Sequence, residues 1–254
     1  MPDKQQVSIF AVVIPAYNEA ATLRDVVERA LKLVTTVIVV DDGSVDATAS
    51  VVQDLPIVLL RNADNQGKAA SLWRGMQHAL QLGAHAVITL DGDGQHNPED
   101  IPRLMEASRT RPRHLIIGAR LGDPSSIPRL RYIANRVATF WISWACGQPL
   151  EDSQSGFRLY PAGLLTGLSI RHNRSRGFVF ESEVLIKAAA RGYRSMAVPI
   201  PAVYQNHARP SHYRHMDSWR IARMVFWSLL SRGFYLPGLY RCFFQAPWKW
   251  RGLQ

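Results

Sequence analysis

The chain has 254 residues, of which 47% are hydrophobic and 20% charged, and this is enough apolar material for one ordinary globular core. The composition excludes a wholly disordered chain. Its two cysteines, Cys146 and Cys242, have neither zinc nor redox spacing and predict a reducing compartment. The first residues lack a basic segment followed by an apolar run, and no stretch reaches roughly 18 uncharged apolar residues. We therefore expect neither a signal peptide nor a transmembrane segment.

The net charge of +10 is unevenly distributed along the chain. Residues 205–254 carry eight Lys and Arg and the single acid Asp217, so they hold +7 of this charge. Four of the seven tryptophans also lie there. The concentration of basic and aromatic residues predicts two regions, a domain over residues 1–214 and a basic amphipathic tail over residues 215–254.

Short apolar runs and amphipathic segments alternate in the first half of the chain. The β-branched runs predict buried strands over residues 7–14, 37–40, 57–60 and 86–90. Apolar residues at helical spacing predict helices near residues 23–34 and over 68–82, the first with Thr22 and Asp25 as a capping pair. Further along, a strand is expected before Arg120, and helices over 133–146 and 177–190.

This order of elements predicts a doubly wound sheet, in which ligands bind beyond the carboxyl ends of the strands. Three loops should then share one edge of the sheet. They are Pro15–Glu19 after the first strand, Asp41–Asp46 after the second and Asp91–Gln95 after the fourth.

The third of these loops has the residue types of a metal site. Asp91, Asp93 and Gln95 are separated by glycines, which let the backbone turn sharply and approach a ligand closely. Two carboxylates and an amide oxygen are hard ligands that suit Mg²⁺ or Mn²⁺, and such an ion would clamp a diphosphate. A merely solvated acidic turn is the alternative, but Asp41 and Asp42 at the same edge would repel these carboxylates without a cation.

Five motifs in order now identify a resemblance. Four of them are VIPAYNE (13–19), VVDDGS (39–44), NQGK (65–68) and DGDGQHNPE (91–99). The fifth is DSQSGFR (152–158), and IIGAR (116–120) and GFVFESE (177–183) flank it and continue the pattern. Together they resemble glycosyltransferase family 2, and closely its dolichyl-phosphate mannosyltransferase and polyprenyl-phosphate glycosyltransferase branch. The resemblance covers about residues 8–215.

The resemblance implies an α/β fold of GT-A type, with a mixed, mainly parallel sheet flanked by helices. It also implies an inverting transfer from a nucleoside diphosphate sugar. Asp93 and Gln95, with Asp91, would bind the metal. The donor would be held by Pro15, Tyr17, Glu19, Asp42, Asp91 and Gly92, with Arg209 on a loop over the diphosphate. That loop departs from the family pattern, because His212 stands where relatives often have lysine.

The resemblance also implies an acceptor site. Arg120, Arg131 and Asn135 would bind an acceptor phosphate, because the guanidinium fork suits phosphate oxygens. Asn135 departs from the serine that polyprenyl-phosphate enzymes often carry. Asp152 and Glu183 resemble the carboxylates near the reaction centre. Asp152 could instead cap a turn or pair with a neighbouring arginine, and a general base is needed only if the acceptor is a hydroxyl rather than a phosphate.

The tail places apolar groups at helical spacing from about Asp217, with arginines between them. This pattern is typical of a helix lying in a membrane interface and predicts peripheral attachment of a cytoplasmic protein to the anionic inner face of the cytoplasmic membrane. Packing on the chain's own domain or on a second subunit is the alternative. Nothing else in the sequence indicates a nucleic-acid module, so we expect no nucleic-acid partner.

Two other functions remain to be weighed against a transferase acting on a lipid-linked acceptor. A sugar nucleotidyltransferase also combines a nucleotide-binding sheet with acidic metal ligands, but the chain has VIPAYNE (13–19) in place of an early glycine-rich loop with lysine. A non-catalytic membrane-associated protein of the same fold is the third hypothesis. The sequence leaves open the base, guanine or uracil, the sugar, the acceptor lipid and whether the protein forms a homo-oligomer.

Overall fold

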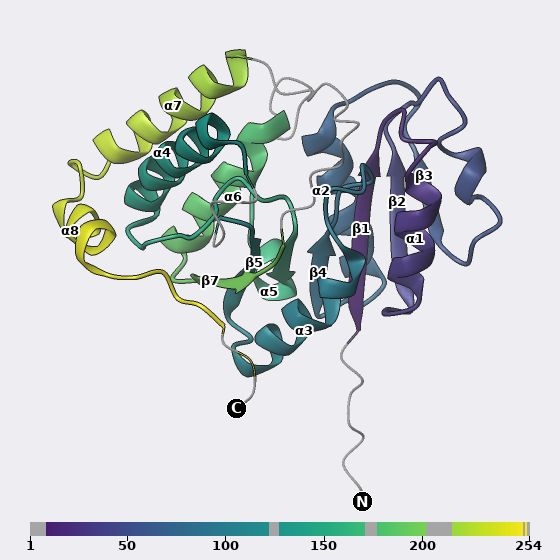
Figure 1. Cartoon of the computed structure of the whole chain (residues 1–254), viewed down its shortest axis with the longest axis horizontal. Helices are drawn as coiled ribbons and strands as arrows, with labels where there is room; N and C mark the ends of the chain where they lie inside the picture. The colour runs from purple at the N-terminus through teal and green to yellow at the C-terminus, as the bar shows by residue number, and fades with distance from the viewer. Residues whose placement is uncertain (1–8, 122–126, 171–176, 202–214, 251, 253–254) are drawn as a thin grey trace, which may run out of the picture.

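The computed structural model describes residues 9–121, 127–170, 177–201, 215–250 and 252. Its centre is a seven-stranded sheet in the order β3-β2-β1-β4-β6-β5-β7, with helices on both faces (Figure 1). The strands are β1 (Phe10–Ala16), β2 (Thr36–Asp41), β3 (Val58–Arg61), β4 (Ala86–Thr89), β5 (His114–Ala119), β6 (Arg158–Pro161) and β7 (Arg194–Pro199). The four strands expected in the first half of the chain are all present.

The sheet is mixed and mainly parallel, as expected. β1 pairs in parallel with β2 and β4, β2 with β3, and β5 with β7. Only β6 runs antiparallel, between β4 and β5. Because one reversed strand separates them, β4 and β5 run in the same direction, and the carboxyl ends of β1, β2, β4, β5 and β7 share one edge.

The described helices include α1 (Leu23–Leu31), α2 (Lys68–Gln81), α3 (Ile101–Thr110), α4 (Arg129–Cys146), α5 (Ala162–Thr166), α6 (Gly177–Ala190), α7 (His215–Leu230) and α8 (Leu236–Phe244), with short 3-10 turns at Ser50–Val52 and Pro98–Asp100. The predicted helices over 68–82 and 177–190 are confirmed. α4 begins four residues before its predicted start, because its first turn contains two arginines and was not recognised as part of the largely apolar segment that follows.

Alternate residues of the central strands face two separate apolar layers. Ala11 and Val13 of β1 pack with α2, α4 and α6, whereas Val12 and Ile14 pack with α1 and α3. All four side chains are fully buried. Burial on both faces explains why the sequence of β1 is a continuous apolar run.

The expected capping of α1 is wrong. Thr22 is the N-cap residue, but its side chain makes no capping hydrogen bond. Instead, Thr22 Oγ1 donates to the carbonyl oxygen of Gly92 at 2.7 Å. The hydroxyl therefore ties the start of α1 to the acidic loop after β4, a contact between segments 70 residues apart.

The C-terminal region returns to the sheet. Ile221, Val225 and Leu229 of α7 are buried in the same apolar layer as α4 and α6. Beyond α8, the backbone of Ala197 in β7 donates to Trp248 O and accepts from Trp250 N, both at 2.8 Å. Among the described residues, no helix combines the length and apolarity needed to cross a bilayer. The boundary at residue 215 stays a prediction.

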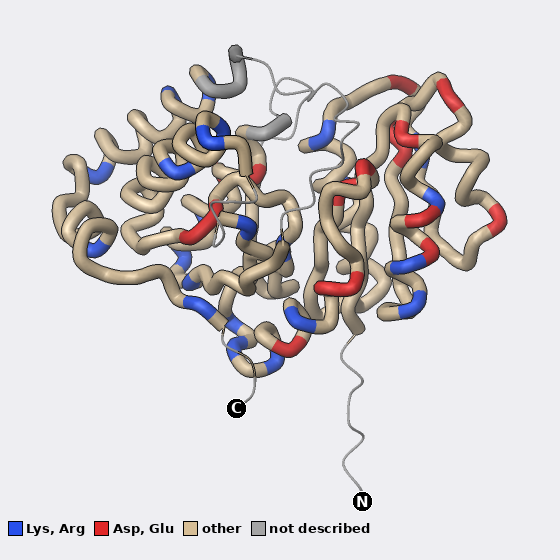
Figure 2. Tube along the Cα trace, viewed as in Figure 1, with Lys and Arg blue, Asp and Glu red and all other residues tan. Residues whose placement is uncertain are grey.

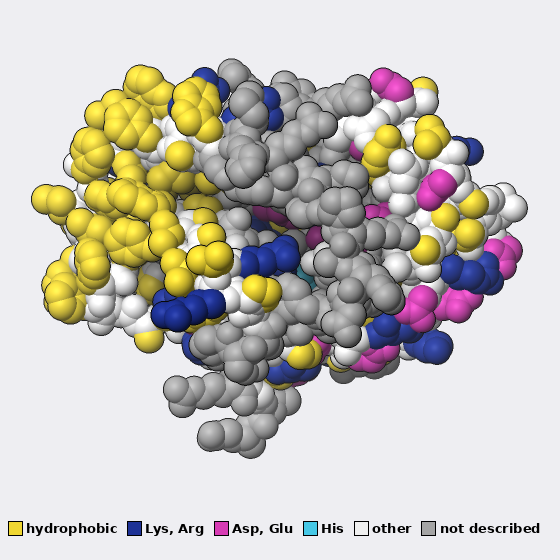
Figure 3. All heavy atoms as spheres, turned by 45° about the horizontal axis from the view of Figure 1, so that its top comes forward, with side chains coloured by type: hydrophobic (Ala, Val, Ile, Leu, Met, Phe, Trp, Pro, Cys, Tyr) yellow, Lys and Arg dark blue, Asp and Glu magenta, His cyan; other side chains and the backbone are white. Residues whose placement is uncertain are grey.

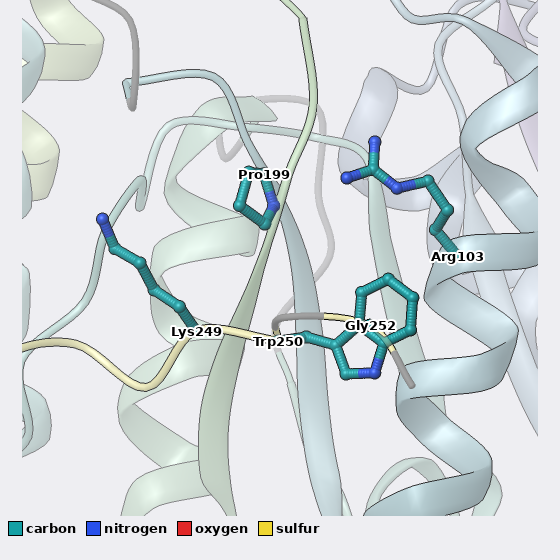
Figure 4. Close-up of a pocket in the computed structure, with 5 residues that line it drawn as sticks. All are labelled: Arg103, Pro199, Lys249, Trp250 and Gly252. Carbon is teal, nitrogen blue, oxygen red and sulfur yellow. The ribbon is translucent and has the colours of Figure 1, made fainter. Parts of the chain in front are cut away.

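A pocket of about 360 Å³ lies where this C-terminal segment crosses β7. It is lined by Arg103, Pro199, Lys249, Trp250 and Gly252 (Figure 4). The two cations at its rim already meet carboxylates, since Arg103 pairs with Asp100 at 2.8 Å and Lys249 with Glu151 at 3.2 Å.

Candidate functional site

The loops after β1 and β2 are bonded to each other, as their place at one sheet edge predicts. Asn18 has a positive φ of 56°, a conformation that asparagine tolerates better than most residues. Its backbone N–H donates to Ser44 Oγ, and its side-chain oxygen accepts from the N–H of Val45, both at 3.0 Å. The N–H of Glu19 donates to Thr48 Oγ1 at 2.8 Å. These bonds make a single rigid rim from two loops.

The carboxylate of Asp42 is buried and organises the start of α2. Its Oδ1 accepts from Asn62 Nδ2 at 2.7 Å and from the N–H of Gln66 at 2.9 Å, and its Oδ2 accepts from the N–H of Gly67 at 2.8 Å. Gly67 is the N-cap residue of α2, so these bonds fix the position of Lys68 at the first helical position. Asp42 therefore connects the loop after β2 to a cation that the sequence analysis did not assign.

Lys68 joins two carboxylates from different parts of the chain. Its ammonium lies 2.8 Å from Asp91 Oδ1, after β4, and 3.2 Å from Glu181 Oε1, on α6. Burial by itself lowers the pKa of Lys68, but the two carboxylates outweigh burial and raise this pKa well above its ordinary value. Burial opposes ionisation of Asp91 too, yet Lys68 holds the pKa of Asp91 below its usual range. The three groups are thus a charged, partly enclosed cluster.

Asp93 differs from Asp91 in its electrostatic surroundings. Burial, and then the negative charge of Asp91, raise the pKa of Asp93. Its Oδ1 accepts a hydrogen bond from the backbone N–H of Gln95 at 2.9 Å, and the side chain of Gln95 is exposed. Two mutually repelling carboxylates beside an accessible amide oxygen are a donor set that fits a hard divalent cation. Within the described part of the chain, no three His, Cys, Asp or Glu side chains lie grouped as metal ligands, so oxygens from outside this group would have to complete the coordination.

Gly156 leaves the space that this cluster occupies. A Cβ atom at Gly156 would lie 3.0 Å from Asp91 Oδ2, 3.0 Å from Glu181 Oε1 and 3.3 Å from Lys68 Nζ. We expect Gly156→Ala to lower kcat about tenfold, because the added methyl displaces Asp91 by a few tenths of an ångström. Steady-state kinetics measures this change. Gly167→Ala is the control, since Gly167 has an ordinary φ of −88° and its Cβ atom would meet nothing closer than 3.8 Å. An unchanged kcat in Gly156→Ala contradicts the prediction.

Asp152 is completely buried beneath Arg120, and both of its oxygens are engaged. Oδ2 accepts from Arg120 Nε at 3.1 Å and from the Arg120 N–H at 3.2 Å. Oδ1 accepts from the N–H groups of Gln154 and Ser155 at 3.0 and 3.1 Å. Asp152 thus caps a turn and orients an arginine at the end of β5, whereas Arg158 donates elsewhere, to backbone carbonyls.

His96 lies near both Asp91 and Arg120, and the sequence analysis did not single it out. It is buried, with its ring 5.6 Å from that of Phe157, and its Nδ1 has no hydrogen-bond partner among the described residues. Burial, reinforced by the charge of Arg120, lowers the pKa of His96 to about 4. The side chain is therefore a neutral spacer between the charged groups. A histidine directly after the acidic loop was its only sequence signal.

The remaining predicted residues lie at the end of β1, in the loops after β1 and β4, on α4 and α6, or outside the described residues. Tyr17 and Glu19 are half-buried in the loop after β1, whereas Pro15 and Gly92 are buried. On the far side, Arg131 is exposed and Asn135 half-buried on α4, and Glu183 forms an ion pair with Lys187 at 2.7 Å on α6. Arg209 lies outside the described residues. Glu181, two positions before Glu183, forms an ion pair with Lys68, which also pairs with Asp91.

Acidic residues accumulate in the half of the molecule that contains β1–β3, and basic residues predominate on α4, α7 and α8 (Figure 2). On the face toward which the strand ends point, acidic and basic side chains meet in the hollow between these halves (Figure 3). The site therefore combines a carboxylate-rich side suited to a cation and a guanidinium side suited to an anion.

The mixed, mainly parallel sheet with an acidic loop at its carboxyl edge has the arrangement of a GT-A type fold. The chain belongs to glycosyltransferase family 2, whose model matches residues 11–162. It is 27% identical over 218 residues to the UDP-N-acetylglucosamine–dolichyl-phosphate N-acetylglucosaminyltransferase of Methanococcus voltae, covering 78% of this chain and 86% of that one. It is 28% identical over 230 residues to the undecaprenyl-phosphate mannosyltransferase of Micrococcus luteus, covering 87% and 94%.

The fold is also that of a solved enzyme. Glucosyl-3-phosphoglycerate synthase from Mycobacterium tuberculosis, in complex with Mn²⁺, uridine diphosphate and phosphoglyceric acid, superposes with a TM-score of 0.62. The match covers 89% of this chain and 78% of that one, at 23% identity. The resemblance to family 2 and the GT-A fold expected from the sequence are confirmed.

Proposed function

We propose that the protein transfers a sugar from a nucleoside diphosphate sugar to polyprenyl phosphate, with inversion at the anomeric carbon. The observation that carries the proposal is the pairing of two differently charged halves at one sheet edge. Asp91 and Asp93 lie on one half, and Arg120, held by Asp152, lies on the other. The named relatives from Methanococcus and Micrococcus, which act on dolichyl and undecaprenyl phosphate, support the same acceptor class.

On the donor side, Tyr17, Glu19 and Asp42 belong to the bonded rim over which the nucleoside would lie. Asp91, Asp93 and Gln95 would hold Mg²⁺ or Mn²⁺. When bound, this ion supplies positive charge to the diphosphate as it leaves. Lys68 holds Asp91 in place through its ammonium group, and Glu181 holds Lys68.

On the acceptor side, Arg120 would bind the phosphate, with Arg131 and Asn135 on α4 as further contacts. A phosphate oxygen attacks the anomeric carbon from the side opposite the diphosphate, so one C–O bond forms as the other breaks. The acceptor phosphate is ionised at neutral pH and needs no base. Both oxygens of Asp152 already accept hydrogen bonds, so the buried carboxylate suits a positioning role better than proton abstraction from a hydroxyl.

The proposal is tested by calorimetric titration with GDP and with UDP, in Mn²⁺ and in EDTA. We expect one of the two diphosphates to bind, and to bind much more weakly without the metal. The preferred base then names the donor class for transfer assays with dolichyl or undecaprenyl phosphate. Binding of neither diphosphate would contradict the proposal and favour a non-catalytic relative of the same fold.

A further inference from the structure

The side of the molecule formed by α4, α7 and α8 exposes many large apolar side chains (Figure 3). Trp227 is 60% exposed and Phe244 is 72% exposed, although both are large aromatic residues. Scattered exposed apolar residues are normal on a protein surface, but a contiguous patch of aromatic groups marks an interaction site. The outer apolar face comprises Leu130, Ile133, Val137, Trp141, Trp219, Phe226, Trp227, Leu230, Phe234, Leu236, Tyr240, Phe243 and Phe244.

Ring contacts make this face continuous between elements that are far apart in the sequence. Phe140 of α4 lies 5.4 Å from Phe243 of α8, measured between ring centroids. Phe234, in the turn between α7 and α8, lies 6.3 Å from both Trp144 of α4 and Phe226 of α7. The tail and α4 of the preceding domain therefore present one surface rather than two.

The charges around the face indicate its partner. Residues 218–254 contain six Lys and Arg and no Asp or Glu, and α4 carries three Arg and no acid. Arg129, Arg136, Arg223 and Arg241 are all exposed. A second copy of the chain docked through the same face would place arginines against arginines. Anionic phospholipid headgroups neutralise them while the acyl region takes up the aromatic groups.

We propose that the outer apolar face of α4, α7 and α8 docks the protein onto an anionic lipid bilayer as one surface, with α4 as an equal part of it. Four residues of α4 form an exposed stripe, spaced three or four positions apart: Leu130, Ile133, Val137 and Trp141. This spacing keeps them on one side of a helix that turns about 100° per residue.

The docking face deepens the proposed function, and rests on it, because the face would orient the acceptor site toward the membrane. Arg131 and Asn135 lie about 100° and 140° around α4 from Leu130, in the direction that the C-terminal half of the helix buries at Ile142 and Cys146. Asn135 is accordingly half-buried, whereas Arg131 is exposed. With the stripe in the lipid, both residues lie toward the far side of a helix roughly 10 Å across, within reach of a lipid-linked phosphate at the bilayer surface.

The test is flotation of the full chain with vesicles of phosphatidylcholine alone and with vesicles containing about one third phosphatidylglycerol. We expect binding to the anionic vesicles that weakens with salt and is much weaker with neutral vesicles. Trp141→Ser on α4, and separately Trp227→Ser with Phe244→Ser, should each reduce the partition coefficient at least about tenfold. Val137→Ser is a second α4 variant, in case the Trp141 variant does not fold. Leu82→Ser, which alters a side chain of similar exposure at the end of α2, should leave binding unchanged.

Several outcomes overturn the docking face. Unchanged flotation of the α4 variants would show that α4 is not part of the docking face. Equal binding to neutral vesicles would show that anionic lipid is not the partner. If light scattering shows a dimer, the Trp227→Ser, Phe244→Ser variant is a monomer and the chain does not bind vesicles, then a second copy of the chain occupies the face instead. Titration with GDP and UDP without vesicles separates the two proposals. Flotation without nucleotide binding contradicts the proposed function alone, and nucleotide binding without flotation contradicts the docking face alone.

Discussion

Replacing Asp93 by alanine is expected to lower metal-dependent sugar transfer at least about a thousandfold while leaving the fold intact. The large loss follows because a divalent ion that stabilises the leaving diphosphate contributes several kcal/mol to the transition state, and about 1.4 kcal/mol corresponds to a factor of ten in rate. The fold is expected to persist because burial and the charge of Asp91 already raise the pKa of Asp93, so its ionised form is under electrostatic strain. Transfer assays with Mn²⁺ and with EDTA measure the effect.

Asp54→Ala is the matched control for this change. Asp54 is an exposed carboxylate whose partner is Arg24, at 2.8 Å on the surface, and such pairs contribute little to stability. The Asp54→Ala variant should transfer sugar at a rate near that of the unaltered protein. Calorimetry of Mn²⁺ binding in the presence of the preferred diphosphate gives a second readout, in which Asp93→Ala should bind the ion weakly. Normal Mn²⁺-stimulated transfer by Asp93→Ala would refute the metal assignment.

Replacing Arg158 by methionine is expected to reduce the free energy of unfolding by at least about 3 kcal/mol. The guanidinium group is fully buried and donates to the carbonyl oxygens of Ser153, Ser155 and Glu181, each at 2.7 Å. Methionine fills much of the volume but leaves three buried carbonyls without these donors. Urea denaturation followed by circular dichroism measures the loss.

The position of Arg158 predicts a loss of activity as well, because it ties β6 to the backbone of α6 at Glu181, whose side chain holds Lys68. Arg111→Met is the control, since Arg111 is exposed at the end of α3 and its replacement should change stability by no more than about 0.5 kcal/mol. If Arg158→Met and Arg111→Met have equal midpoints of denaturation, the buried guanidinium does not support the fold as described.

The acidic candidate metal site could be read from the sequence because it is local. Asp91, Asp93 and Gln95 stand within five residues of each other after an apolar run, and apolar runs at this spacing predict strands. Parallel connections then place every such loop at one edge. The bonded rim formed by Asn18 with Ser44 confirms that inference.

The long-range partners could not be read from the sequence. Lys68, Asp91 and Glu181 come from α2, the end of β4 and α6, and nothing in their local sequence indicates that they meet. The reversed strand β6 was missed for a similar reason. Its sequence, RLYP (158–161), is not an apolar run, and its direction is determined only by pairing with β4 and β5.

By itself, the sequence determined the family, the strand-end loops and the basic aromatic character of the tail, because these depend on residue types at short spacing. Only the tertiary structure decided how these parts are used. α7 turns Ile221, Val225 and Leu229 into the core while exposing Trp227, so the same amphipathic helix both completes the domain and contributes to its outer face. Hydrophobic periodicity identifies an apolar side of a helix, but whether that side meets protein or lipid depends on packing partners that lie elsewhere in the chain.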